Sequence, residues 1–149
     1  MKPIVKAAAM VLVAGVAWYQ FRDGAQVAAG TAQPAAAARP ADGVREAFEQ
    51  QARGRMLQAA GRVERILADD RDESPHQRFI IATDSGVTVL VAHNLDLAPR
   101  LNGLARGDQV TVYGEYEWNP QGGVLHWTHD DPQGRHAAGY IEWQGRKYQ

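Results

Sequence analysis

The chain has 149 residues, which is enough for one domain and a terminal extension. Hydrophobic residues make up 45% of the chain and charged residues 22%, as in ordinary soluble folds. The formal net charge is −1, and residues 43–149 carry 12 Lys and Arg against 15 Asp and Glu. This acidic balance argues against a non-specific polyanion binder. The absence of Cys excludes disulfides, thiolate catalysis and a Cys zinc site.

The N-terminus has the pattern of an export signal. Lys2 and Lys6 precede an apolar run at 7–18, and aromatic residues follow it. We expect residues 1–23 to be a cleaved signal peptide or an uncleaved signal-anchor helix, which would attach the chain to a membrane. Either reading predicts a domain in the periplasm, free or anchored to the inner membrane.

Residues 24–42 are rich in Ala and Pro and predict a flexible linker. The globular domain is therefore expected at 43–149. Its first segment, 43–60, predicts a helix, because apolar residues recur at four-residue spacing from Val44 to Met56. Asp42 is the expected N-cap.

The hydrophobic period then changes to two, which predicts strands. Turn residues separate the strands, and the segment after Asn94 predicts a short helix or turn that carries Leu97, Leu101 and Leu104. The expected strands are 61–68, 76–83, 87–93, 109–118 and 124–128, with a final hairpin of 140–143 and 146–148. Three strands, a short helix and two strands predict a mainly β fold, a small OB-like five-stranded β-barrel. A small barrel of another topology is the alternative.

Four strings in this domain resemble a known bacterial family: HQRFI (76–80), AHNLDLAPR (92–100), GDQVTVYGEYEWN (107–119) and HWTHDDP (126–132). The family is a domain of unknown function, number 3465, so the resemblance implies no activity, cofactor or partner. The family pattern has a second His after WTH, where this chain has Asp130. The resemblance therefore carries no metal ligand to that position.

The His residues offer a possible divalent-metal site. His126, His129 and His136 lie close together in the sequence, and His is the commonest metal ligand. On a regular strand, however, side chains three apart point to opposite faces. His126 and His129 can share a metal only if the strand ends near Thr128 and the chain turns before Pro132. Otherwise, these imidazoles serve as local hydrogen-bonding groups.

A second set of polar residues combines bases and acids. His76 and Arg78 share one face of a strand, His93 ends the next, and Glu115 shares a face with Glu117. Convergence of these groups would suit phosphodiester hydrolysis, whereas an Arg78–Glu115 or Arg78–Glu117 ion pair is the structural alternative.

Aromatic residues form a third set. The alternation at 109–118 predicts that Tyr116 and Trp118 point inward with the valines, and that Tyr113 lies on the surface. A surface aromatic side chain could stack on bases or sugar rings.

Three functions remain open from the sequence. The first is a ligand-binding module for nucleic acid or an oligosaccharide, with a site formed by His76, Arg78, His93, Tyr113, Glu115, His126 and His129. The second is a metal-assisted hydrolase, such as a phosphodiesterase or nuclease, with a divalent metal on His126, His129 and His136. In that hydrolase, Glu115 would act as a base or further ligand, and Arg78 would stabilise the transition state. The third is a structural or interaction protein of the cell envelope.

Overall fold

The computed structural model describes residues 43–71 and 74–149. The predicted hydrophobic helix at 1–23 and the linker at 24–42 lie outside these ranges. No helix within the two ranges has the length and apolar character needed to span a bilayer.

The described chain forms one short helix and seven strands. In order, these are α1 (Val44–Glu49), β1 (Arg53–Ile66), β2 (His76–Thr83), β3 (Thr88–Asn94), β4 (Gln109–Glu117), β5 (Val124–His126), β6 (Tyr140–Trp143) and β7 (Arg146–Tyr148).

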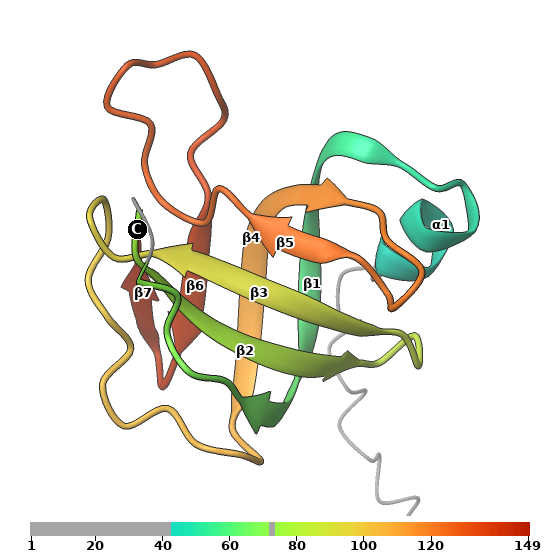
Figure 1. The fold of residues 1–149 in the computed structure, drawn as a ribbon, viewed down its shortest axis with the longest axis horizontal. Coiled ribbons are helices and arrows are strands. Elements are labelled where there is room, and N and C mark those ends of the chain that lie inside the picture. Colours follow the sequence, from blue (N-terminus) through green and yellow to red (C-terminus); the bar gives the residue numbers. More distant parts are fainter. Residues whose placement is uncertain (1–42, 72–73) are drawn as a thin grey trace, which may run out of the picture. The chain divides into compact units, whose positions relative to one another are not determined.

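Five strands close into a barrel in the order β1-β2-β3-β5-β4, because β4 also pairs with β1. Antiparallel pairing joins every neighbouring pair except β3 and β5, which run parallel with Leu90 opposite Val124. Figure 1 shows these strands wrapped around one core, with the β6–β7 hairpin beside β4. The structure thus confirms the prediction of a mainly β, OB-like five-stranded barrel.

Strand β1 closes the barrel because it pairs with two partners in turn. Residues 53–62 pair with β4, and residues 61–66 pair with β2. Gly61 lies where the two pairings overlap, and a Cβ there would come within 2.6 Å of the Ala82 carbonyl oxygen. A register shift between Val63 and Arg65 follows. Such irregularities bend a strand, which lets β1 turn from one side of the barrel to the other.

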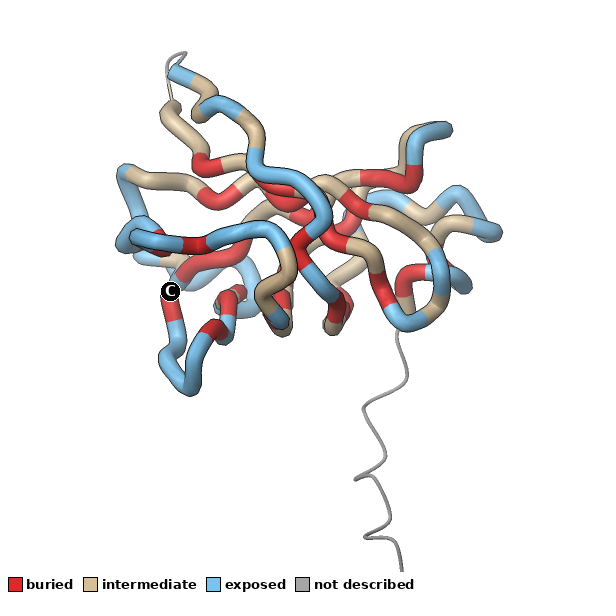
Figure 2. Tube along the Cα trace, turned by 90° about the horizontal axis from the view of Figure 1, so that it is seen from below, coloured by how far each residue is buried: buried red, intermediate tan, exposed pale blue. Residues whose placement is uncertain are grey.

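The core comes from strand alternation, visible in Figure 2 as buried and partly exposed residues that alternate along the strands. On β4, residues 110, 112, 114 and 116 point inward and the odd-numbered residues point outward. Tyr116 is fully buried, while Tyr113 is partly exposed on the outer face, as predicted. Val44 and Ala47 of α1 join the core, as do Leu101 and Leu104 of the β3–β4 connection. In Figure 1, α1 and that connection lie at opposite ends of the barrel.

The predicted helix at 43–60 is wrong in length. Helix α1 has six residues, and its N-cap is Gly43 without a side-chain cap. The helix ends in a Schellman arrangement, in which the Ala52 N–H donates to the Ala47 carbonyl and the Gln51 N–H to the Phe48 carbonyl. Gln51 has φ 52°, a conformation that usually selects Gly, so this end of the helix was not predictable from the residue types.

The sequence predicted a short helix or a turn after β3. The structure shows turns there and no helix. Leu101 and Leu104 are buried, whereas Leu97 is 43% exposed, so the helical spacing of these leucines does not reflect one buried helical face. Pro99 disfavours helix at the preceding residue, and Gly103 has φ 87°, which interrupts a helix. The strands at 76–83, 140–143 and 146–148 agree with the prediction at both ends.

We expect Gly114→Ala to destabilise the barrel by roughly 1–3 kcal/mol, the usual cost of overpacking. A Cβ at Gly114 would lie 2.4 Å from the His126 carbonyl oxygen and 2.9 Å from Thr128 Cγ2, so β4 and β5 would have to separate. Urea denaturation of the full chain measures the change. Gly43→Ala is the control, because its nearest neighbour would be Leu57 Cβ at 3.7 Å. Equal losses in the two variants would contradict this account of β4–β5 closure.

Candidate functional site

The candidate site lies on the outer wall of the barrel, where β4 and β5 pair. Strand β5 ends at His126, two residues earlier than predicted, because Trp127 adopts the left-handed conformation with φ 56°. The ladder register places His126 directly opposite Glu115. Both side chains point outward, so the fold brings an imidazole and a carboxylate together across two strands.

His126 and Glu115 lie close without forming a hydrogen bond. His126 Nε2 is 3.5 Å from Glu115 Oε1, and the Glu115 side chain is only 17% exposed. Nε2 itself is shielded from solvent and has no hydrogen-bond partner, although the rest of the imidazole is partly exposed. Buried polar atoms are nearly always paired, so an unpaired ring nitrogen beside a carboxylate needs a physical explanation.

Glu117 extends this pair because residues two apart share a face of β4. One ligand atom from each of Glu115, Glu117 and His126 lies within 4.8 Å of the other two. The Glu117 carboxylate also has contacts on β1. Its Oε1 accepts a hydrogen bond from the Gly54 N–H at 2.9 Å, and its Oε2 is 3.5 Å from Arg53 Nη1. These contacts hold the Glu117 carboxylate in position beside the other two side chains.

The loop between β5 and β6 supplies a second imidazole. His136 Nδ1 is 3.6 Å from Glu115 Oε2, so His126 and His136 flank opposite oxygens of one carboxylate. Asp131 organises this loop, because its carboxylate accepts the backbone N–H groups of Gln133 at 2.9 Å, His136 at 2.8 Å and Arg135. The Gln133 hydrogen bond is the largest of the causes that lower the pKa of Asp131. We call Glu115, Glu117, His126 and His136 the Glu115 cluster.

His129 does not join the cluster, so the predicted set of His126, His129 and His136 is not assembled. His129 is buried, and its Nδ1 donates to the Asp130 carbonyl oxygen at 2.6 Å. Its ring packs on Trp127 with centroids 4.9 Å apart, and His136 packs on the same indole at 4.3 Å. Within the described residues, only Glu115, Glu117 and His126 have ligand atoms close enough to hold an ion together.

A family model described as "Protein of unknown function (DUF3465)" matches residues 27–149. The chain belongs to the DUF3465 family. This confirms the resemblance inferred from the four strings, which include Glu115, Glu117 and His126 of the Glu115 cluster. A comparison with curated proteins found no match.

The other basic residues predicted for the site lie elsewhere in this DUF3465 domain. Arg78 donates from Nε and Nη2 to the Ala68 carbonyl oxygen at 3.1 and 3.0 Å. Arg78 pairs with Ala92 of β3, and β3 separates β2 from β5, the strand that carries His126. Neither predicted ion pair of Arg78 with Glu115 or Glu117 forms. His76 lies at the start of β2, where its backbone pairs with Asp70.

His93 is a buried structural residue in this domain, so we leave it out of the proposed site. Its Nδ1 lies 2.8 Å from the Thr128 hydroxyl, and its Nε2 lies 3.2 Å from the Pro99 carbonyl oxygen. A carbonyl only accepts, so Nε2 carries the proton and Nδ1 accepts from Thr128. Burial lowers the pKa of His93 from 6.5 to about 4, and the nearby His129 and His76 act in the same direction.

Some residues of the site were not among the binding, catalytic and metal residues predicted from the sequence. Glu117 had a usable signal, because alternation places it on the face of Glu115, and Arg53 opposite it has the complementary charge. Trp127 had no such sequence signal, because nothing in the residues around it predicts a left-handed backbone at a bulky residue. Asp131 carried only an ordinary turn signal.

We expect stability to decrease by about 3 kcal/mol as the pH falls from 6.5 to 4, through His93 alone. The unfolded chain takes up the proton near pH 6.5, whereas the folded state resists it until about pH 4. Stability is therefore retained above pH 6.5 and lost through this window. Urea denaturation across the window measures the loss, and His93→Gln should flatten the pH profile while lowering stability at pH 7. Identical profiles for the two proteins would contradict this assignment.

Proposed function

We propose that this domain binds a divalent metal ion at the Glu115 cluster and uses the ion to hold an oxygen-bearing ligand. The observation that carries the proposal is the unpaired, shielded Nε2 of His126, 3.5 Å from the Glu115 carboxylate. A metal ion would give this nitrogen the partner that it lacks in the described structure. Glu117 supplies a further oxygen within the same reach.

The donor set indicates which ions fit. One or two imidazole nitrogens with two carboxylates suit Zn²⁺, Mn²⁺ or Fe²⁺, whereas Mg²⁺ and Ca²⁺ prefer oxygen alone. Three protein ligands leave coordination positions open, as in metal sites that bind water or substrate. The indole of Trp127 packs against the His136 ring, and its buried Nε1 also lacks a hydrogen-bond partner, so an acceptor atom of a bound ligand would satisfy it.

Metal-assisted hydrolysis is the second candidate, favoured by those open positions, at which a bound water would become a nucleophile. The position of Arg78 counts against a phosphodiesterase of the kind expected from the sequence, since this guanidinium is held on Ala68. Activity of the metal-loaded chain on a simple phosphodiester, abolished by Glu115→Gln, would favour the hydrolase. Binding without turnover would favour the ligand-binding module.

We expect the full chain to bind about one equivalent of Zn²⁺ or Mn²⁺ in isothermal titration calorimetry. His126→Ala and Glu115→Gln should each lower the affinity at least ~10-fold, since even residues behind a metal ligand have effects of that size. His76→Gln is the control, because His76 lies outside the cluster. Failure of both ions to bind would contradict the proposed metal site and would favour an envelope structural or interaction protein.

We also expect bound metal to slow tryptic cleavage after Arg135 by about tenfold, because a ligand that binds the closed form raises the free energy of opening. His136 reaches Glu115 from the same loop, so an ion shared with His136 would fasten the loop to β4. Mass spectrometry of timed digests measures the rate. Cleavage after Arg106, on the β3–β4 connection, is the internal control and should not change. His136→Ala should still bind metal but lose the protection; protection that survives this variant would exclude His136 from the site.

We propose from the sequence alone that the domain works in the periplasm, free or held at the inner membrane by residues 1–23. The charged start and the apolar run at 7–18 support this proposal. Fractionation of cells that express the full chain, with N-terminal sequencing of the mature protein, distinguishes cleavage from anchoring.

A further inference from the structure

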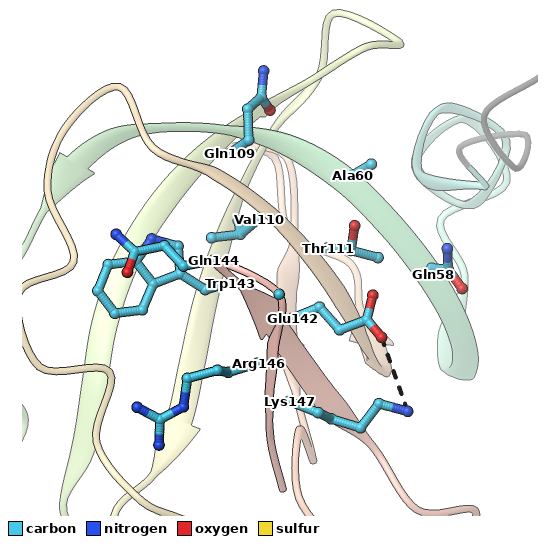
Figure 3. Close-up of a pocket in the computed structure, with 11 residues that line it drawn as sticks. Gln58, Ala60, Gln109, Val110, Thr111, Glu142, Trp143, Gln144, Arg146 and Lys147 are labelled. Carbon is cyan, nitrogen blue, oxygen red and sulfur yellow. Dashed lines mark ion pairs between the residues drawn. The ribbon is translucent and has the colours of Figure 1, made fainter. Parts of the chain in front are cut away.

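We infer that a groove on the outer face of β1, β4, β6 and β7 binds a short, hydroxyl-rich oligosaccharide. This site is separate from the Glu115 cluster and needs no metal. The groove has a volume of about 470 Å³, and ligand sites typically measure about 300–1,000 Å³. Figure 3 shows side chains from all four strands around it.

Strand register builds the first row of the groove. Ala60, Thr111, Glu142 and Lys147 lie opposite one another across β1, β4, β6 and β7. All four residues line the groove, and Ala60 leaves room above β1 because it has no side chain beyond Cβ. The row therefore presents a hydroxyl, a carboxylate and an ammonium group to one shallow space.

A second row runs parallel to the first and adds aromatic surface. Gln58, Tyr113 and Tyr140 are opposite one another on β1, β4 and β6. The rings of Tyr113 and Tyr140 are tilted, with centroids 5.6 Å apart, and the Tyr140 hydroxyl donates to Gln58 Oε1 at 3.3 Å. Tyr113 is partly exposed beside Gln58, which lines the groove, so the C–H face of a sugar ring that extends past Gln58 can pack on this ring.

The polar groups match hydroxyls better than phosphates. The amide of Gln58 and the hydroxyl of Thr111 each combine donor and acceptor character, as sugar hydroxyls do. Adjacent hydroxyls of a sugar can therefore exchange hydrogen bonds with several side chains at once. A phosphate oxygen, which only accepts, would use half of this capacity.

The charges in the groove argue against nucleic acid. Lys147 Nζ is 4.0 Å from Glu142 Oε1 and 4.0 Å from the centre of the Tyr140 ring, and Arg146 lies 5.6 Å from the centre of the Tyr148 ring. The cations thus already have partners, and Glu142 would repel a phosphate backbone. Residues 43–149 also carry a net negative charge, whereas nucleic-acid affinity depends on unpaired Lys and Arg.

The test titrates the full chain with chitotetraose, cellotetraose and maltotetraose, and separately with a short oligo(dT), by NMR of ¹⁵N-labelled protein. EDTA is present throughout, so that the outcome does not depend on the metal proposal. We expect at least one tetrasaccharide to shift the amide resonances of Thr111, Glu142 and Lys147. Thr111→Val and Glu142→Gln should each weaken that binding roughly 3- to 10-fold, the effect of one lost hydrogen bond. Both substitutions nearly preserve side-chain volume.

Leu97→Ser, an exposed position on the β3–β4 connection, is the matched control and should bind as the unmodified chain does. The inference would be overturned if the resonance shifts were confined to other faces of the domain. It would also be overturned if Thr111→Val and Glu142→Gln bound the tetrasaccharide as tightly as the unmodified chain does. It would also be overturned if no tetrasaccharide bound, or if oligo(dT) alone bound at the groove. Because EDTA removes divalent metal ions, none of these results bears on the metal site proposed at the Glu115 cluster, which calorimetry tests separately.

Discussion

The pairing of β4 with β1 along one edge and with β5 along the other is the constraint on which the rest of this structure depends. Gly114 permits it, because its missing side chain leaves space for the backbone of β5 at His126. Tyr116, inward on the same strand, fills the core and donates its hydroxyl proton to the Gly122 carbonyl oxygen, which holds the β4–β5 turn. Closure thereby sets two outer-face alignments at once: Glu115 against His126, and Tyr113 against Gln58.

Most of the fold was predictable because it depends on local patterns. The alternation of β4 and the boundaries of β2 follow directly from the order of apolar and polar residues. Two departures have one physical cause: Gln51 and Trp127 adopt left-handed backbone conformations without being Gly, and each ends an element early. The candidate site was harder to predict, since it depends on register between strands. Composition singled out Glu115, His126 and His136, but only the structure shows that His129 turns into the protein and Arg78 turns to Ala68.

His93 and His126 show how the surroundings decide the chemistry of one residue type. The ring of His93 satisfies both nitrogens within the fold, through Thr128 and Pro99, and burial keeps it neutral. His126 has a shielded nitrogen that the fold leaves without a hydrogen bond. A fully satisfied imidazole contributes to folding, whereas an unsatisfied one represents a cost that a bound partner can remove. This contrast, more than the spacing of His residues in the sequence, distinguishes a structural histidine from a candidate ligand.

The outward row of β4 has a consequence for the size of ligand that the domain can recognise. Successive outward side chains on a strand are about 7 Å apart, so Thr111 in the groove and Glu115 in the cluster are separated by about 14 Å. A single small molecule cannot span this distance, but an extended polymer lying along β4 can occupy both places. Two weak contacts on one polymer reinforce each other through effective concentration. The spacing of the outward residues along β4 would thus let a polymer that reaches both places bind more tightly than a short oligosaccharide that reaches the groove alone.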